Sequence, residues 1–368
     1  MKHHSKLILI LTIFLSLILS CLCIQNLFAQ SSLKEASYYE KLENKLVQCH
    51  LCPRNCTILD GQRGFCGVRE NRGGTLFTLS YGKLVSMNDL DPIEKKPLFH
   101  FLPGTKTFSI ATAGCNMKCK FCQNWEISQM RPEDVKYVYM QPDKLVELVK
   151  ESGRPTIAYT YSEPTIFYEY MFETAKIARE QGLKNIMHSN GYINEEPLRQ
   201  LVKYLDAANI DLKGFSDEYY AKLADGTLEP VLKALKILKE SGVHLEITTL
   251  ILSGFNDDEK TLREMCQWIK DNLGDETPLH FSRFFPMYKL TFLNPTPVES
   301  LEKARRIALE TGLKYVYIGN IAGHEAENTF CPRCGKIVIE RKGYFIVEIN
   351  IVDGKCKFCG YEIKGVWK

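Results

Sequence analysis

Three cysteines in a single loop are the residues of this chain best placed to do chemistry. The stretch ATAGCNMKCKFCQNWEISQ, residues 111–129, sets Cys115, Cys119 and Cys122 in the pattern C-x3-C-x2-C. Structural zinc sites and ordinary iron–sulfur clusters are usually closed by four protein ligands. A site with three thiolates leaves one iron of a cluster free to bind a substrate or a cofactor. The spacing therefore predicts an iron–sulfur cluster with one open coordination position.

Two further pairs of cysteines, near the C-terminus, have the spacing of a zinc ribbon. Each pair is C-x2-C followed by glycine, and a β-rich stretch separates the pairs. Four thiolates suit a closed tetrahedral site, for which we expect structural zinc, with a rubredoxin-like iron as the open alternative. The predicted ligands are Cys331, Cys334, Cys356 and Cys359.

A third group of cysteines lies near the start of the chain, in the pattern C-x2-C-x3-C-x9-C. One interpretation is an auxiliary iron–sulfur cluster that relays electrons, and the other is a structural metal site that fixes this segment. Thiolates suit both iron and zinc, so the sequence leaves the metal open. The predicted ligands are Cys49, Cys52, Cys56 and Cys66.

The overall composition narrows the range of partners. The 47 basic and 44 acidic side chains of the 368 residues give a net charge of +3, so there is no strong field of one sign to attract nucleic acid. We therefore expect no nucleic-acid partner. Most of the 14 cysteines fall in the three clusters, which favours metal sites over disulfides.

The N-terminus has the pattern of a targeting segment. The first six residues include basic side chains, and no charged residue occurs from Leu7 to Ala29. Residues 1–30 are therefore predicted to be a signal peptide or a membrane anchor, through which the chain would associate with a membrane. This prediction conflicts with the cluster chemistry, because assembly and reduction of an oxygen-sensitive cluster are expected in the cytoplasm. A misassigned translation start is the alternative.

The elements that must position the cysteine loop alternate regularly after Lys106. Apolar runs alternate with amphipathic helical patterns, which predicts an α/β fold: a partial or complete parallel βα barrel. The predicted strands are 107–114, 156–164, 184–191, 207–214, 244–254, 279–286 and 315–320. The predicted helices are 143–153, 165–182, 196–205, 231–242, 261–274 and 298–312.

The alternation also suggests domain boundaries. After the leader, we expect a cysteine-rich segment over 31–105, the barrel over 106–325 and a zinc-ribbon-like module over 326–368. Active sites of βα barrels form at the C-terminal ends of the strands. Polar residues near the C-terminal ends of the predicted strands are Glu163, Asn190, Asp211 and Asn320.

The cysteine loop, with Phe121 before its last cysteine, resembles the signature of the radical SAM superfamily, and it directly follows the first barrel strand. The resemblance implies a 4Fe–4S cluster and S-adenosylmethionine (SAM), whose amino and carboxylate groups bind the open iron. It also implies reductive cleavage of SAM to a 5'-deoxyadenosyl radical. A zinc knuckle, or cysteines that only fill the core, would be the alternative.

Other strand-end motifs extend the resemblance. The stretch YTYSEPT is similar to the Gly-Gly-Glu motif of the superfamily and implies that Glu163 binds the SAM amino group, although Tyr161 and Ser162 replace the glycines. The stretches HSNGY and NIDLKGF resemble motifs of activases of glycyl-radical enzymes. They imply that three residues lie near the methionine carboxylate or the ribose. These are Asn190, Asp211 and Lys213; for the last two, a structural ion pair is the alternative.

Within the superfamily, the chain is similar to the radical SAM component of the AmmeMemoRadiSam system, a relative of pyruvate formate-lyase activating enzyme. The stretches CHLCPRNCTILDGQRGFCGVR and DPIEKKPLFHFLPGT contribute to this resemblance. It implies an oxidoreductase-type radical enzyme that abstracts hydrogen from an unidentified substrate and takes electrons from a flavodoxin or a ferredoxin. One alternative is a glycyl-radical activase, with a protein as substrate. The other is a non-catalytic metal-binding or electron-transfer protein.

Overall fold

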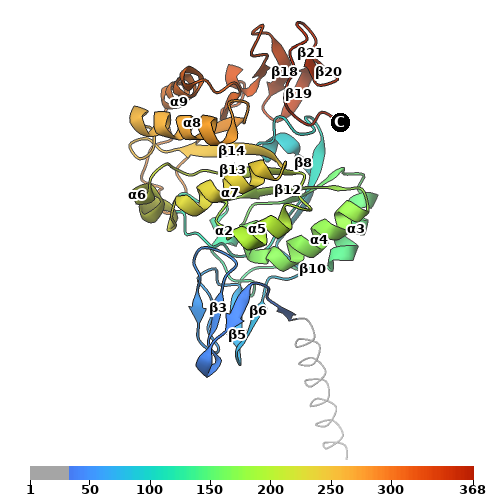
Figure 1. The fold of residues 1–368 in the computed structure, drawn as a ribbon, viewed down its shortest axis with the longest axis vertical. Helices are drawn as coiled ribbons and strands as arrows, with labels where there is room; N and C mark the ends of the chain where they lie inside the picture. Colours follow the sequence, from blue (N-terminus) through green and yellow to red (C-terminus); the bar gives the residue numbers. More distant parts are fainter. Residues whose placement is uncertain (1–32) are drawn as a thin grey trace, which may run out of the picture.

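The computed structural model describes residues 33–368, and the predicted leader lies outside this range. None of the helices in this range has the length and apolar composition needed to span a membrane. Figure 1 shows an α/β body in the middle, with a small β module from the N-terminal part at one end and another from the C-terminal part at the opposite end.

The body is built on a sheet of eight strands in the order β16-β15-β14-β13-β12-β11-β9-β8. Seven strands are parallel, and β8 pairs antiparallel with β9 at one edge. Because β8 and β16 end the strand order and do not pair with each other, the barrel is partial. All seven strands expected from the sequence are present, which confirms the α/β prediction. The bounds are β8 Ser86–Pro92, β9 Lys106–Ala111, β11 Thr156–Tyr159, β12 Lys184–Ser189, β13 Ala207–Asp211, β14 His244–Ile251, β15 Leu279–Arg283 and β16 Val316–Gly319.

Strand β8 was not expected from the sequence. It lies inside the predicted cysteine-rich segment 31–105, yet it belongs to the main sheet. Its residues SMNDLDP carry few apolar side chains, because an edge strand needs little burial. The 3-10 turn η2 (Ile93–Lys95) follows it directly.

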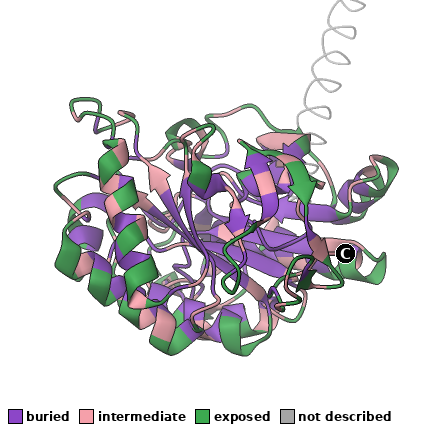
Figure 2. Cartoon of the chain, turned by 90° about the horizontal axis from the view of Figure 1, so that it is seen from above, coloured by how far each residue is buried: buried purple, intermediate pink, exposed green. Residues whose placement is uncertain are grey.

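Helices cover the outer face of the sheet. Figure 2 shows the purple, buried strands inside and helices whose green, exposed sides face outward. The longer ones are α3 Pro142–Glu151, α4 Tyr168–Glu180, α5 Glu195–Leu201, α7 Glu229–Glu240, α8 Glu259–Leu273 and α9 Val298–Thr311. The short ones are α2 Trp125–Ser128, η3 Pro164–Phe167, α6 Asp217–Tyr219 and the π-helical turn η4 Tyr220–Ala224.

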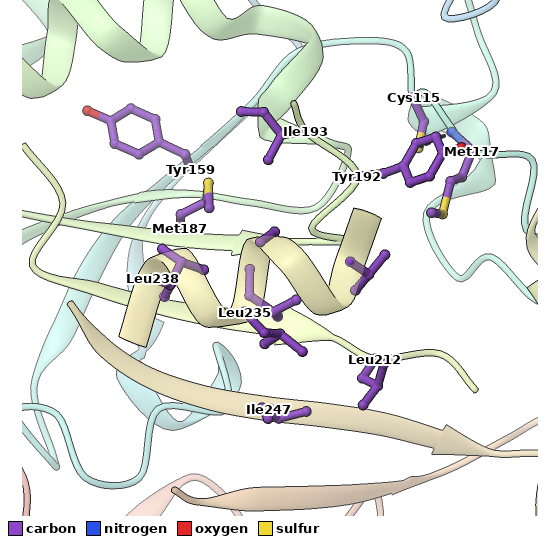
Figure 3. Packing of buried hydrophobic residues seen from close by; sticks show 14 of the residues in the cluster. Cys115, Met117, Tyr159, Met187, Tyr192, Ile193, Leu212, Leu235, Leu238 and Ile247 are labelled. Carbon is purple, nitrogen blue, oxygen red and sulfur yellow. Dashed lines mark hydrogen bonds between the residues drawn. The ribbon is translucent and has the colours of Figure 1, made fainter. Parts of the chain in front are cut away.

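One apolar core joins helices and sheet. Leu235 and Leu238 of α7 share it with Met187 of β12 and Ile247 of β14, and all four are almost fully buried (Figure 3). The helical spacing of three residues places both leucines on one face of α7. Burial of a leucine side chain contributes about 2 kcal/mol, so such contacts hold the strand ends in fixed positions.

The N-terminal module consists of two small antiparallel sheets, β1-β6-β5 and β2-β3-β4. A separate pair, β7 with β10, connects the following segment to the body. The bounds are β1 Lys34–Glu35, β2 Tyr39–Lys41, η1 Glu43–Lys45, β3 Val47–Cys49, β4 Thr57–Ile58, β5 Arg69–Arg72, β6 Thr75–Thr78, β7 Lys83–Leu84 and β10 Val138–Tyr139.

The C-terminal module packs on the β16 edge of the sheet. Tyr315 and Tyr317 from this edge share a buried cluster with Cys331 and Cys356 of the module. The chain end returns to the body, where the Val366 amide donates to the His100 carbonyl over 2.7 Å. The bounds are η5 Glu325–Glu327, β17 Thr329–Phe330, β18 Ile337–Lys342, β19 Phe345–Ile349, β20 Ile351–Val352 and β21 Lys355–Cys356.

Candidate cofactor site

A cavity of about 400 Å³ opens at the C-terminal ends of the parallel strands. The loops after β9, β11, β12 and β13 line the cavity. Asn320, the residue after β16, also lines it. The structure thereby gathers residues that the sequence separates by about a hundred positions. Seven predicted site residues line this cavity: Cys115, Cys119, Cys122, Glu163, Asn190, Asp211 and Lys213.

The cysteine loop is held by backbone contacts. It starts at Gly114, whose φ of +104° is accessible to glycine and strained for other residues. The amides of Lys118 and Lys120 donate to the carbonyls of Ala224 and Leu223, at 2.9 and 2.8 Å. The π-helical turn η4 therefore fixes the loop, and with it the positions of the thiols.

The chemistry of the three thiols fits a cluster with a cationic metal core. Burial raises the pKa of Cys115 well above that of a free thiol, and burial raises the pKa of Cys119 to about 11. Buried thiolates are stable beside metal cations, which remove the thiol protons. The Met117 amide also donates to the Cys115 sulfur over 3.4 Å, and Ser128 Oγ lies 3.1 Å from the Cys122 sulfur.

Glu163 is a buried carboxylate with four hydrogen bonds from the protein. Its Oε1 accepts from the amide and hydroxyl of Thr165, at 2.9 and 2.7 Å, and from Ser189 Oγ at 2.7 Å. Its Oε2 accepts from the Asn190 amide at 2.9 Å. Burial outweighs these bonds and raises the pKa of Glu163. A cationic ligand group in the cavity would stabilise the ionised carboxylate, so the site suits an amino group.

Asn190 connects the end of β12 to the cysteine loop. Its Nδ2 donates to Asn116 Oδ1 over 2.9 Å and lies 3.7 Å from the Cys115 sulfur. Its Oδ1 accepts from the Tyr192 amide over 2.9 Å. Figure 3 shows Tyr192 and Met117 beside Cys115. Asn190 therefore contacts a predicted cluster ligand, Cys115, as well as lining the cavity.

Asp211 lies between two basic side chains. Lys213 Nζ and His188 Nε2 are each 3.1 Å from one of its oxygens. Burial opposes ionisation of Asp211, but Lys213 and His188 outweigh it and hold the pKa of Asp211 well below its usual range. Burial likewise opposes the charge on Lys213, but Asp211 and the Cys119 sulfur keep its pKa well above the usual value. The group is a charged pair on the cavity wall.

One of the two residues that replace the expected glycines has a glycine-like backbone. Tyr161 has φ of +66°, in the left-handed region that a glycine adopts freely. Its hydroxyl donates to the buried carboxylate of Asp91, which Lys96 Nζ also contacts at 2.8 Å. Lys96 lies 4.1 Å from the centre of the Tyr161 ring. These contacts stabilise a strained turn, so the departure from the glycine pattern leaves the turn intact.

Sequence reasoning assigned no role to residues 91–96, although this stretch contributed to the family resemblance. Glu94 and Lys96 from this stretch line the cavity. Burial raises the pKa of Glu94 to about 7. Its Oε1 accepts from the Gly104 amide over 2.8 Å, while Oε2 is buried without a partner. The signal in the sequence that could have drawn attention to Glu94 is its place in the stretch DPIEKKPLFHFLPGT, which carries part of the family resemblance.

The four C-terminal cysteines have the spacing of a single-ion site. Their sulfurs all lie within 4.8 Å of one another, and no other group of three or more Cys, His or acidic residues within 33–368 meets this limit. Two of the distances are 3.5 Å, for Cys331–Cys359, and 3.8 Å, for Cys334–Cys356. Metal–sulfur bonds of about 2.3 Å put the sulfurs of a tetrahedral ion about 3.8 Å apart. This group could therefore hold one metal ion.

Comparison with known proteins identifies the family. Residues 109–268 match the sequence profile of the radical SAM superfamily. The chain is also 50% identical over 333 residues to the uncharacterized protein MJ0808 of Methanocaldococcus jannaschii, over 90% of this chain and 99% of that protein. The chain belongs to the radical SAM superfamily. Membership implies an enzyme that uses a 4Fe–4S cluster and SAM.

Two more distant similarities are to a pyruvate formate-lyase activating enzyme and to a radical SAM methyltransferase. Pyruvate formate-lyase 1-activating enzyme of Escherichia coli is 20% identical over 220 residues, covering 55% of this chain and 89% of that enzyme. A solved radical SAM methyltransferase from Sphaerobacter thermophilus has 16% identity and a TM-score of 0.48, over 64% of this chain and 71% of that chain. The similarity to the pyruvate formate-lyase activating enzyme is one of low identity.

Proposed function

We propose that this radical SAM protein cleaves SAM reductively and abstracts a hydrogen atom from a substrate. The observation that carries the proposal is the common cavity: three thiols, a buried carboxylate, an amide and a lysine–aspartate pair line one space of about 400 Å³. When bound there, the cluster and SAM supply a 5'-deoxyadenosyl radical. A closed metal site, as in a purely electron-transferring protein, would not need these polar side chains around an open space.

The protein groups have separate roles in this proposal. Cys115, Cys119 and Cys122 hold the cluster, and Asn190 positions the first of them. Glu163 binds the amino group of SAM, because a buried carboxylate fixed by four protein hydrogen bonds is already oriented for a cation. Orientation fixed in advance lowers the entropy lost when the ligand binds.

The pair of Asp211 and Lys213 offers both an acceptor and a donor to the rest of SAM. The Asp211 carboxylate suits a ribose hydroxyl, and the Lys213 ammonium suits the methionine carboxylate. Because the two are 3.1 Å apart, each stabilises the charge of the other. The His188 ring fixes the other oxygen of Asp211.

Activation of a glycyl-radical enzyme is the second candidate, supported by the similarity to pyruvate formate-lyase activating enzyme. In this case the hydrogen donor is a glycine of a partner protein. Incubation of the reduced protein and SAM with a candidate partner would test it by electron paramagnetic resonance (EPR). A glycyl-radical signal on the partner would support an activase, whereas SAM cleavage without such a signal on any candidate would favour another substrate.

SAM binding tests the proposed role of the cavity. We expect Glu163→Gln to weaken SAM binding by about 10- to 100-fold, since a charged hydrogen bond is worth about 1.5–3 kcal/mol. Iron content should stay that of the unmodified protein. Equilibrium dialysis with reconstituted protein measures the affinity, and the exposed Glu147→Gln is the matched control. Equal affinity of the two variants would reject the role of Glu163.

A further inference from the structure

We propose that Cys49, Cys52, Cys56 and Cys66 hold a second iron–sulfur cluster, which passes electrons to the cofactor site of the barrel. The cluster itself is inferred independently of the chemistry in the barrel. The relay rests on the proposed function, since it needs an electron acceptor there.

The four cysteines converge although they are spread over residues 49–66. All four line one small cavity of about 20 Å³ between the N-terminal module and the barrel. The Cys49 amide donates to the Cys56 carbonyl over 2.9 Å, which closes the loop that carries three of the ligands. The Gly67 amide donates to the Gly64 carbonyl over 2.9 Å, in the turn that contains the fourth. The fold therefore brings four thiols to a common centre.

The spacing of the thiols favours a cluster over a single ion. The sulfurs of the C-terminal cysteines all lie within 4.8 Å of one another, and the sulfurs of these four are farther apart. Four thiols that surround a cavity, at distances too large to bind one ion together, suit a metal core that is larger than a single ion. Four thiolates are the usual ligand set of such iron–sulfur clusters.

Arg69 supplies a second indication that a group belongs in this cavity. It lines the cavity, is 1% exposed and places Nη1 3.5 Å from the Cys49 sulfur. Its Nη2 donates to the buried carboxylate of Glu169, but its Nε is buried without a partner. Buried N–H groups are nearly always hydrogen-bonded. The inorganic sulfides of a cluster would add acceptors inside the cavity, whereas a lone ion adds none.

The proposed cluster lies directly against the SAM cluster loop. A Cβ at Gly114 would lie 3.1 Å from the Cys66 carbonyl oxygen, so the residue before Cys115 lies close to the backbone of a predicted ligand of the second site. Thr165 lines the four-cysteine cavity and donates to Glu163, which lines the cofactor cavity. One layer of residues therefore separates the two sites, which is a short path for an electron.

The relay balances for one electron. A reduced flavodoxin or ferredoxin gives one electron to the N-terminal cluster, which returns to its oxidised state when it reduces the cluster in the barrel. That electron is consumed when the carbon–sulfur bond to C5' of SAM breaks. The products are methionine and the 5'-deoxyadenosyl radical.

Metal analysis of a variant without the barrel ligands tests the second cluster. We expect Cys115→Ala/Cys119→Ala/Cys122→Ala, reconstituted anaerobically with iron and sulfide, to keep about half of the iron and labile sulfide of the unmodified protein. Dithionite should produce an EPR signal that SAM does not change. Adding Cys49→Ala/Cys52→Ala should abolish this signal, and adding Cys266→Ala, a buried cysteine outside all clusters, should not. A variant that holds zinc, or no metal, at this site would overturn the proposal.

Freeze-quenched EPR of the unmodified protein tests the relay without any substitution. After mixing with reduced flavodoxin, the SAM-insensitive signal should rise before the SAM-sensitive one. A SAM-sensitive signal that rises first would refute the relay but not the presence of the N-terminal cluster. If no SAM-sensitive signal forms, both the proposed function and the relay are refuted. Metal analysis of the triple variant still shows whether the N-terminal cysteines hold a cluster.

Discussion

Replacing Gly114 with alanine should disturb the contact between the N-terminal module and the cysteine loop. The new Cβ would lie 2.5 Å from Val68 Cγ1 and 3.1 Å from the Cys66 carbonyl oxygen. The first distance is far inside van der Waals contact, and the second involves backbone that cannot move without moving a cysteine. The residue would also have to keep φ of +104°.

The expected magnitude is the sum of two terms. A left-handed backbone costs a residue with a Cβ about 1–2 kcal/mol. Overpacking costs about 1–3 kcal/mol more. We therefore expect Gly114→Ala to lower the free energy of unfolding by about 2–5 kcal/mol.

Gly153 provides a matched control for the backbone term. It has φ of +70°, and a Cβ there would meet nothing within 4 Å. Gly153→Ala should therefore lose only the backbone term, about 1–2 kcal/mol. Urea unfolding followed by circular dichroism measures both variants. Equal losses in the two would refute a close approach of Cys66 to the cysteine loop.

Two further predictions concern the buried acid and the C-terminal metal site. Burial raises the pKa of Glu94 to about 7, so the folded state binds this proton more tightly than the unfolded chain does. The resulting contribution to the free energy of unfolding is fully present below pH 4.5, where Glu94 is protonated in both states. About 3 kcal/mol of this free energy is lost as the pH rises to 7. Glu94→Gln should remove this slope in unfolding free energies measured between pH 4.5 and 8, and a slope equal to that of the unmodified protein would contradict the burial argument. Cys331→Ser/Cys334→Ser should release the C-terminal metal and lower the melting temperature, because metal binding at such a site is coupled to folding. Unchanged melting would exclude a structural role, and native protein with iron at this site would contradict our choice of zinc.

The parts of the site that the sequence predicted are those encoded locally. Cys115, Cys119 and Cys122 lie within eight residues of one another, so their spacing alone indicates a cluster. Glu163 follows β11 and Asp211 is the last residue of β13, and parallel strands bring their C-terminal ends to one edge. Local pattern and the geometry of a parallel sheet were sufficient for these residues.

The parts that the sequence did not predict depend on long-range contacts. Glu94 and Lys96 reach the cavity because β8 pairs antiparallel with the edge of the sheet, outside the alternation of strands and helices. The compensation for the missing glycines is also non-local, since Tyr161 bonds Asp91 seventy positions away. The strands of the N-terminal module have only two to four residues, too few to show a period.

Reductive cleavage of SAM by purified, reconstituted protein is the measurement that tests the central claim most directly. The unmodified protein and the Cys266→Ala control should form 5'-deoxyadenosine when reduced with dithionite in the presence of SAM. Cys119→Ala should form none while keeping metal at the C-terminal cysteines, because the two sites are separate. Formation of 5'-deoxyadenosine by Cys119→Ala at the rate of the unmodified protein would contradict the assignment of the cluster loop.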